Sequence, residues 1–189
     1  MGKKRYYTVP QKNNKKLSEK DFQNREKILR GFFLKNSDIL RLTRITWGPA
    51  LFGFITSINK KSGKIWGADK DLKFIKFKDS IKKDFIKKVA NNKKYEDIKQ
   101  PLNQKFEHYF YKLSKKVKDL LNNETLFFTN INNYYNSDNF YGFEDPTFYK
   151  NKKMAGCVIS HELQISLFLT KKEKDILERK GIDLIEPIN

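Results

Sequence analysis

Residues 147–181 read TFYKNKKMAGCVISHELQISLFLTKKEKDILERKG, and this stretch decides the fold class of the 189-residue chain. Apolar runs at 147–149, 154–159 and 163–169 are separated by short polar segments. Runs of this length with turn residues between them are typical of strands that pair in order along the chain. The sequence therefore predicts a small antiparallel meander.

A short helix is predicted directly after the meander. Thr170 and Glu173 are spaced as a capping box, in which each side chain satisfies a backbone N–H of the other residue. Ile176 and Leu177 provide an apolar contact, and Gly181 follows where a helix commonly ends in a left-handed residue. Strands closed by a helix indicate an α+β domain, whereas a doubly wound parallel sheet would need regular alternation of strands and helices.

Three substantial helices are predicted upstream of the meander. The first covers about 18–35, with Ser18 and Asp21 as a capping box. The second covers 80–89 and the third 106–121. In each of them apolar residues recur at helical spacing. Lysines occupy the other side of the second helix and the flanks of the third, as in an amphipathic helix.

The remaining segments complete the predicted architecture. Residues 51–58 and 64–66 flank a turn and predict a hairpin, and 72–77 could add a third strand. Residues 1–16 have no apolar period and predict a flexible basic arm, so 17–189 form a single domain. The predicted fold class is thus α+β, with a mostly antiparallel sheet, three substantial helices, a short C-terminal helix and the flexible basic N-terminal arm.

Positive charge is concentrated in the first two thirds of the chain. Residues 1–123 hold 32 Lys and Arg against 12 Asp and Glu, a net charge of +20, whereas residues 124–189 hold 8 against 10, a net charge of −2. A field of this size attracts polyanions and speeds their encounter with the protein. The asymmetry therefore favours an anionic partner for the first two thirds.

Genome composition offers a competing explanation for part of this charge. Lys outnumbers Arg 34 to 6, Asn and Ile stand at 17 each, and these amino acids have A/T-rich codons. The same bias would also raise Asp and Glu, which number only 22 against 40 basic residues. We therefore interpret the lysine excess as functional, in a protein from an A/T-rich bacterial or phage genome.

Nucleic acid is the predicted anionic partner, because lysines alternate with aromatic residues in the middle of the chain. Ammonium groups neutralise phosphates and release counterions, and exposed rings can stack on unpaired bases. Lysine-rich faces at 60–95 and 105–118 are expected to contact the phosphate backbone. The candidate nucleic-acid-binding residues are Arg41, Arg44, Lys73, Lys76, Lys78, Lys82, Lys83, Lys87, Lys88, Lys112, Lys115 and Lys116.

Lysine dominance limits what such binding can achieve. Arg forms the bidentate contacts that read guanine, whereas Lys acts as a mobile point charge. Arg41 and Arg44 are the exceptions, and Asp38 is positioned to pair with either of them. We expect an accessory protein that holds the DNA or RNA backbone with little base specificity and steep salt dependence. It is not expected to be an enzyme, and no cofactor is predicted.

An aromatic segment supports a second hypothesis, a protein-interaction module. Residues 124–149 hold nine aromatic residues, five Asn and four acidic residues, and they contain no Lys or Arg. Such a segment can pack in the core with Asn at its turns, or it can form an exposed partner surface. In the second case residues 127–149, with Tyr134, Tyr135 and Tyr141, would bind a protein, as in an inhibitor or immunity factor of a bacterial conflict system.

A metal-dependent nuclease is the third hypothesis. Glu144 and Asp145 precede one predicted strand, and His161 with Glu162 follows the next, so the four residues could converge across a hairpin. Carboxylates could then hold Mg²⁺ or Mn²⁺ beside an imidazole base. Adjacent residues in a strand point to opposite faces, which argues against His161 and Glu162 serving one site.

Cys157 and His108 are expected to have structural roles. Cys157 is the only cysteine, so an intrachain disulfide is excluded, and its apolar neighbours favour a buried packing residue. His108 lies within the predicted helix at 106–121 and is expected at the boundary of the core. No window approaches the ~20 apolar residues of a membrane span, and the basic N-terminus lacks the apolar stretch of a secretory signal. These observations predict a cytoplasmic protein.

Overall fold

The computed structural model describes residues 3–9, 19–47, 75–94, 103–122, 144–159 and 164–186. In chain order the elements are β1 (Arg5–Val9), α1 (Glu19–Asn36), β2 (Ile39–Trp47), η2 (Lys82–Asp84), β3 (Phe85–Lys94), β4 (Asn103–Lys112), α4 (Lys115–Asn122), β5 (Glu144–Lys150), β6 (Lys153–Ile159), β7 (Gln164–Leu169) and α5 (Lys171–Arg179). Residues 75–80 are also helical and lie directly before η2. The predicted hairpin at 51–66 and the predicted cap at Ser18 lie outside the described residues.

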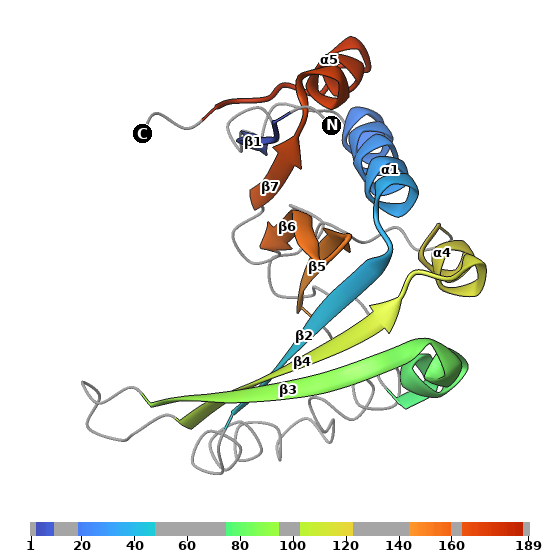
Figure 1. Cartoon of the computed structure of the whole chain (residues 1–189), viewed down its shortest axis with the longest axis vertical. Coiled ribbons are helices and arrows are strands. Elements are labelled where there is room, and N and C mark those ends of the chain that lie inside the picture. The colour runs from blue at the N-terminus through green and yellow to red at the C-terminus, as the bar shows by residue number, and fades with distance from the viewer. Residues whose placement is uncertain are drawn as a thin grey trace.

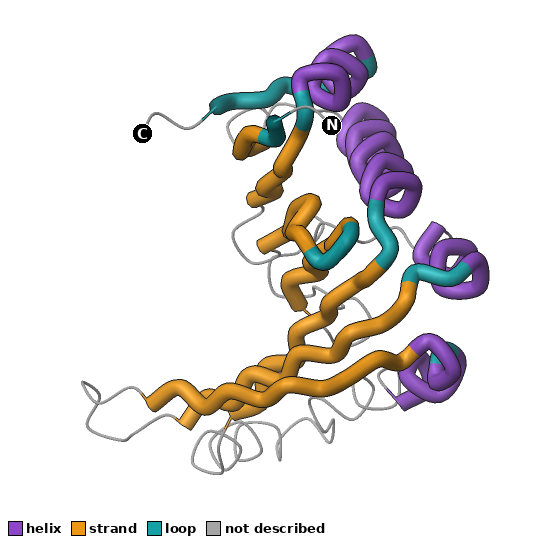
Figure 2. Tube along the Cα trace, viewed as in Figure 1, coloured by secondary structure: helices purple, strands orange, loops and turns teal. Residues whose placement is uncertain are grey.

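One seven-stranded sheet organises the fold, with strand order β1-β7-β6-β5-β2-β4-β3. Every pairing between neighbouring strands is antiparallel. Helices α1, α4 and α5 lie along one side of this sheet (Figure 1), and the long strands β2, β4 and β3 extend away from them (Figure 2). The predicted α+β fold with a mostly antiparallel sheet is confirmed.

The core lies between the sheet and the helices. Alternate residues of neighbouring strands face it, because side chains of a strand point to opposite faces with a period of two. Leu40 of β2 pairs with Tyr111 of β4 on one side and Phe148 of β5 on the other, and all three are fully buried. Phe33 of α1 stacks on Phe148, with ring centroids 4.5 Å apart and an interplanar angle of 12°.

The C-terminal meander and closing helix follow the sequence prediction closely. Strands β5, β6 and β7 pair in order, and Asn151 and Lys152 form the first turn with positive φ values of 49° and 64°. Thr170 Oγ1 accepts a hydrogen bond from the Glu173 N–H, and the Glu173 carboxylate accepts one from the Thr170 N–H, so the capping box is present. Gly181 follows the helix at φ +81°.

The helix predicted at 106–121 is wrong for its first half. Residues 103–112 form β4, a strand that pairs with both β2 and β3, and a shorter helix, α4, begins only at Lys115. Glu107, Tyr109 and Tyr111 are buried on one face of β4. The spacing of Phe106 and Phe110 fits both periods, and the aromatic content of the segment favours a strand.

The predictions for 72–77 and 80–89 are reversed. Residues 75–77 are helical where a strand was expected, and residues 85–89 belong to strand β3 where a helix was expected. Residues 72–74 lie outside the described residues. Of the predicted apolar stripe only Ile81 is buried, since Phe85, Ile86 and Val89 are 43%, 48% and 38% exposed. Pairing with β4 therefore determines the conformation of this segment, and helical spacing does not.

Residues 5–9 correct the prediction of a flexible arm at 1–16. They form β1, which pairs with β7 in a register that places Tyr7 opposite Leu167 and Val9 opposite Ile165. All four of these side chains are buried. Tyr7 and Val9 alternate with Tyr6 and Thr8, which is the pattern of a strand with one buried face, although the surrounding basic and polar residues hide it in the sequence.

No helix in the described part of the chain is long and apolar enough to cross a bilayer.

Gly31 lies in the middle of α1 without a packing reason. It is exposed, and nothing lies within 4 Å of the position that a Cβ atom would occupy. A glycine in a helix interior costs about 1 kcal/mol relative to alanine. We therefore expect Gly31→Ala to raise the free energy of unfolding by about 1 kcal/mol in urea denaturation, with an unchanged m-value. A less stable variant would contradict the described environment.

Candidate nucleic-acid interface

Lysines from two segments about thirty residues apart in the sequence gather at one corner of the molecule, where 75–83 meets the end of β4 and the start of α4. We call this surface the lysine corner. Segments 76–88 and 112–119 together hold ten lysines and three aspartates, a net charge of +7. The lysine corner consists of Lys76, Lys78, Lys82, Lys83, Lys112, Lys115 and Lys116, which are all exposed.

Aromatic and aliphatic side chains bring the two segments together. Phe77 and Ile81 are buried, and the Phe77 ring lies edge-on to Tyr111 with centroids 6.0 Å apart. Phe85 contacts the same Tyr111 ring at 5.8 Å. The Lys116 ammonium group also donates a hydrogen bond to the backbone carbonyl of Ser80. The helix at 75–80 is therefore anchored on the sheet while its lysines face outward.

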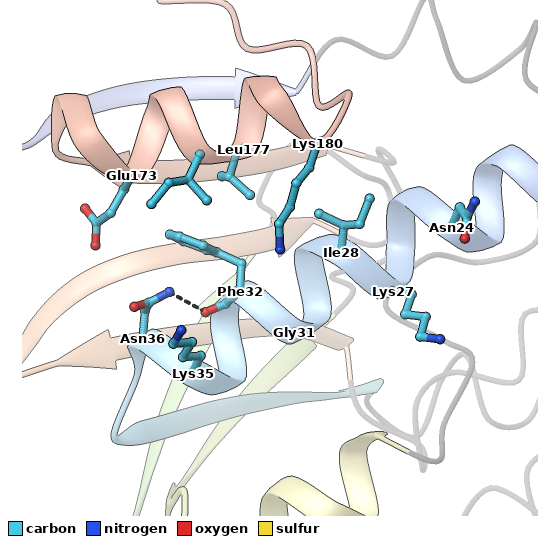
Figure 3. A pocket seen from close by; sticks show the side chains of 11 residues that line it. Asn24, Lys27, Ile28, Gly31, Phe32, Lys35, Asn36, Glu173, Leu177 and Lys180 are labelled. Atoms are coloured by element: carbon cyan, nitrogen blue, oxygen red, sulfur yellow. Dashed lines mark hydrogen bonds between the residues drawn. The ribbon is translucent and has the colours of Figure 1, made fainter.

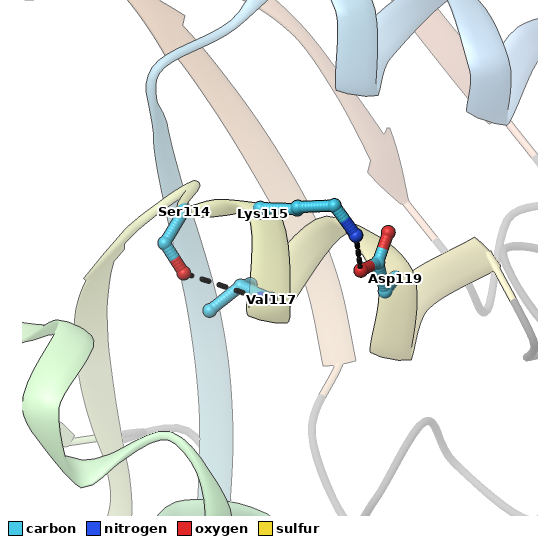
Figure 4. Close-up of polar contacts among 4 residues, drawn as sticks. All are labelled: Ser114, Lys115, Val117 and Asp119. Atoms are coloured by element: carbon cyan, nitrogen blue, oxygen red, sulfur yellow. Dashed lines mark hydrogen bonds and ion pairs between the residues drawn. The ribbon is translucent and has the colours of Figure 1, made fainter.

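The start of α4 concentrates positive charge where a helix usually carries negative charge. Ser114 begins the helix, and its Oγ accepts a hydrogen bond from the Val117 N–H at 3.3 Å (Figure 4). Lys115 and Lys116 occupy the first turn, which holds no acidic residue. Cations are unfavourable at the positive end of the helix dipole, whereas anions are stabilised there. A phosphate at this point would offset the repulsion.

Few carboxylates neutralise the lysine corner. Lys115 pairs with Asp119 at 2.6 Å across one turn of α4. Exposed ion pairs of this kind contribute little to the free energy of unfolding. In the described part of the chain, by contrast, no carboxylate pairs with the four exposed lysines Lys78, Lys82, Lys83 and Lys112. These four side chains are therefore available to an external anion.

The predicted residues on β3 point to opposite faces of the sheet. The Lys88 ammonium group forms an ion pair with the buried Glu107 at 2.7 Å, and the Tyr109 hydroxyl donates to the same carboxylate at 2.8 Å. The hydrogen bond to Glu107 raises the pKa of Lys88. Lys87 instead lies over the Phe110 ring, with its nitrogen 5.0 Å from the ring centroid. Lys88 thus has a structural partner, and Lys87 extends the lysine corner along the sheet.

The two predicted arginines lie in the sheet and not in the lysine corner. Arg41 donates a hydrogen bond from Nη2 to Thr147 Oγ1 at 2.7 Å. Arg44 lies directly opposite Glu107 in the register of β2 and β4. Asp38, the partner considered for both, accepts a hydrogen bond from the Asn151 N–H at 3.0 Å instead. Lys73 lies outside the described residues.

A pair of aromatic rings on the sheet face opposite the helices was missed by the sequence prediction. Phe110 and Tyr149 are both half-buried, and their centroids lie 6.2 Å apart. On the same strand face His108 contacts Thr43, with Nδ1 and Oγ1 separated by 3.1 Å. Burial, with a smaller contribution from Arg41, lowers the pKa of His108. The alternation of 106, 108 and 110 would have identified this face if 103–112 had been interpreted as a strand.

The other two hypotheses concern residues that the structure describes only in part. Asp145 is half-buried and has a positive φ of 49°, but the side chain of Glu144 and all of His161 and Glu162 lie outside the described residues. So do Tyr134, Tyr135 and Tyr141. In the part of the chain that is described, no three His, Cys, Asp or Glu side chains are grouped as metal ligands would be. Cys157 is half-buried, and burial raises the pKa of its thiol.

Tyr111 carries a buried hydroxyl that meets no hydrogen-bond partner in the described structure. A buried donor without a partner costs about 1 to 3 kcal/mol, so Tyr111→Phe should retain or raise the free energy of unfolding by up to about 1 kcal/mol at neutral pH. Tyr109→Phe is the matched control. It removes a hydroxyl that donates to Glu107 and should therefore lower stability.

The buried Tyr111 hydroxyl should also make the free energy of unfolding depend on pH in the alkaline range. Burial, with a smaller contribution from Tyr109, raises the pKa of Tyr111 well above its ordinary value of about 10. The neutral phenol is thus favoured in the folded state. Its contribution to stability is fully present below about pH 10 and is lost as the pH rises further. Tyr111→Phe should weaken the loss of stability above pH 10 in denaturation series, and an unchanged slope would contradict this assignment.

Comparison with protein-family models, with curated proteins and with solved structures finds no match to this chain. Function is therefore inferred from the charges and contacts described above. Those contacts single out the lysine corner and the Phe110 face, because Lys112 of the lysine corner lies on the same side of β4 as the half-buried Phe110 ring and has no carboxylate partner among the described residues.

Proposed function

We propose that this protein binds nucleic acid through the lysine corner, without catalysis and with little base specificity. The single observation that carries the proposal is that seven lysines of two distant segments gather on one surface, where only Lys115 has a carboxylate partner in the described structure. Lysines contact phosphates as point charges, and release of counterions then supplies the free energy of binding.

The aromatic face supports a preference for single strands. Lys112 lies two residues after Phe110 and therefore on the same face of β4, and Lys87 lies above the Phe110 ring. A phosphate backbone that follows these two lysines passes next to the ring, which the Lys87 ammonium group covers when no nucleic acid is bound. Unpaired bases can stack there, whereas the bases of a duplex are already stacked on each other.

Binding measured against salt tests the proposal. Fluorescence anisotropy with labelled oligo(dT), oligo(U) and a DNA duplex of similar length should give a logarithm of affinity that falls steeply and linearly with the logarithm of NaCl concentration. Several lysine–phosphate contacts would give a slope of about −3 or steeper. An affinity that does not change between low and moderate salt would overturn the proposal.

Phe110→Leu separates stacking from charge. Leucine retains an apolar side chain in the sheet but offers no flat ring, so oligo(dT) affinity should fall by about tenfold, in line with 1 to 3 kcal/mol per stacked base. Duplex affinity and the salt slope should stay the same. Phe168→Leu is a matched control, since Phe168 is a half-buried ring near the other edge of the sheet. Equal effects of the two variants on oligo(dT) affinity would contradict a stacking role for Phe110.

A further inference from the structure

A groove between α1 and α5 forms a second candidate binding surface, well separated along the fold from the lysine corner. It has a volume of about 560 Å³. Its apolar floor comes from Ile28 and Phe32 of α1 and from Ile176 and Leu177 of α5. Figure 3 shows Ile28, Phe32 and Leu177 between the two helices, with Lys180 reaching from the end of α5 toward α1.

The charges that line this groove are almost entirely positive. Lys27 and Lys35 come from α1 and Lys180 from just beyond α5. No described carboxylate forms an ion pair with any of these three lysines. Glu173 is the one acidic residue in the lining, and its carboxylate already accepts hydrogen bonds from the Thr170 N–H and hydroxyl at 2.8 Å. The groove thus combines an apolar floor with cations that form no ion pair with a carboxylate of the described residues.

Gly31 lies in the α1 wall of the groove, at a position where a small side chain leaves the groove open. Open space surrounds the position of its missing Cβ atom, so packing within the chain does not require glycine there. A side chain as large as leucine at this point of α1 would project into the space that the groove occupies.

We infer that the groove binds an acidic amphipathic helix of a protein partner. The lining residues of α1 extend from 24 to 36, a length of about 18 Å at 1.5 Å per residue, which matches about three turns of a bound helix. Apolar residues at i, i+3, i+4 and i+7 of that helix would contact Ile28, Phe32 and Ile176. Its flanking carboxylates would face the unpaired lysines, which supplies electrostatic complementarity.

A designed peptide tests this inference directly. The probe is a fluorescein-labelled peptide of about fifteen residues, with leucines on one helical face and glutamates on its flanks; the comparison peptide has lysines in place of the glutamates. The full-length protein should bind only the acidic peptide. Gly31→Leu should fill the groove and weaken binding by at least about tenfold, which is 1.4 kcal/mol.

Matched variants identify where the peptide binds. Gly31→Ala also removes the helical glycine but leaves the groove open, so its affinity should equal that of the wild type. Lys27→Glu with Lys35→Glu should weaken binding, whereas Lys82→Glu with Lys83→Glu makes the same charge change at the lysine corner and should leave it largely intact. Circular dichroism of each variant checks that the fold is retained.

The result that would overturn the inference is also specific. Wild-type affinity in Gly31→Leu, or an equal loss in the Lys82 and Lys83 variant, would mean that the peptide associates with general surface charge and not with the groove. Binding of oligo(dT) to Gly31→Leu should be unchanged, because Gly31 lies outside the lysine corner. The groove and the nucleic-acid interface can therefore fail or hold independently.

Discussion

Replacing Lys78, Lys82, Lys83 and Lys112 together with glutamine is expected to lower the affinity for oligo(dT) by about 100- to 1,000-fold at ~0.1 M salt. These four side chains are exposed and have no carboxylate partner in the described structure. Each lost phosphate contact removes about 0.7 from the salt slope of a single strand, so the slope should become less steep by about 2 to 3. Anisotropy titrations at several NaCl concentrations measure both quantities.

A matched variant distinguishes a local surface from total charge. Lys4, Lys153, Lys171 and Lys172 are also exposed and lie away from the lysine corner. Their replacement with glutamine changes the net charge by the same amount, but it should lower the affinity by less than about tenfold through the long-range field alone. Equal losses in the two quadruple variants would show that lysine enrichment acts as a diffuse coat, and the proposed interface would be abandoned.

Phe33→Ala is expected to give the largest loss of stability, about 3 to 5 kcal/mol. Phe33 is 1% exposed and stacks on the fully buried Phe148, so its removal leaves a cavity between α1 and the centre of the sheet. Much of the stability of a typical domain would be lost, since that total is only about 5 to 15 kcal/mol. Urea denaturation followed by circular dichroism measures the change, and a loss below about 1 kcal/mol would contradict the packing described here.

Gly156 provides an independent test of the same contact. A Cβ atom at this position would lie 2.5 Å from Phe33 Cε1 and 2.5 Å from the backbone oxygen of Ser166. Gly156→Ala should therefore destabilise the fold through overpacking by about 1 to 3 kcal/mol. In a Phe33→Leu background the ring is absent, and a double-mutant cycle should show that the cost of Gly156→Ala is smaller. Additive effects would mean that the two residues do not share a site.

The C-terminal third could be predicted from the sequence because its signals are local. A capping box at Thr170, a left-handed glycine at 181 and strands joined by short turns each depend on a few neighbouring residues. Apolar contacts within the same segment then select the same structure that these local signals favour. Agreement between local and tertiary preferences is what makes such a region predictable.

The prediction for the middle of the chain was wrong because the helical period of 3.6 and the strand period of 2 both fit the same apolar residues. Phe85 and Val89, or Phe106 and Phe110, are four apart, a spacing that suits one face of a helix and equally one face of a strand. Strand pairing between β3 and β4 decides the outcome, and that contact is not visible in either segment alone. Propensity is outweighed in such cases by packing against a partner that is distant in sequence.

The candidate site was predictable as a list of residues but not as a surface. Lysines at 76–83 and 112–116 were identified from composition, whereas their meeting depends on Tyr111, which contacts both Phe77 and Phe85. Arg41 could not be separated from them by sequence, because its partner Thr147 lies more than a hundred residues away. Phe110 was missed since the wrong period assigned it to a buried helical stripe.

The position of β1 at the edge of the sheet has a consequence for synthesis in the cell. Its partner β7 lies about 160 residues further along the chain, and Thr8 also bridges to Ile185. On the ribosome β1 therefore emerges long before β7 has been synthesised. During that time its two tyrosines and its valine are exposed to solvent. Contacts of such long range slow folding and prolong exposure of unpaired edges. We therefore expect nascent chains of this protein to depend on chaperones that shield β1 until β7 has been synthesised.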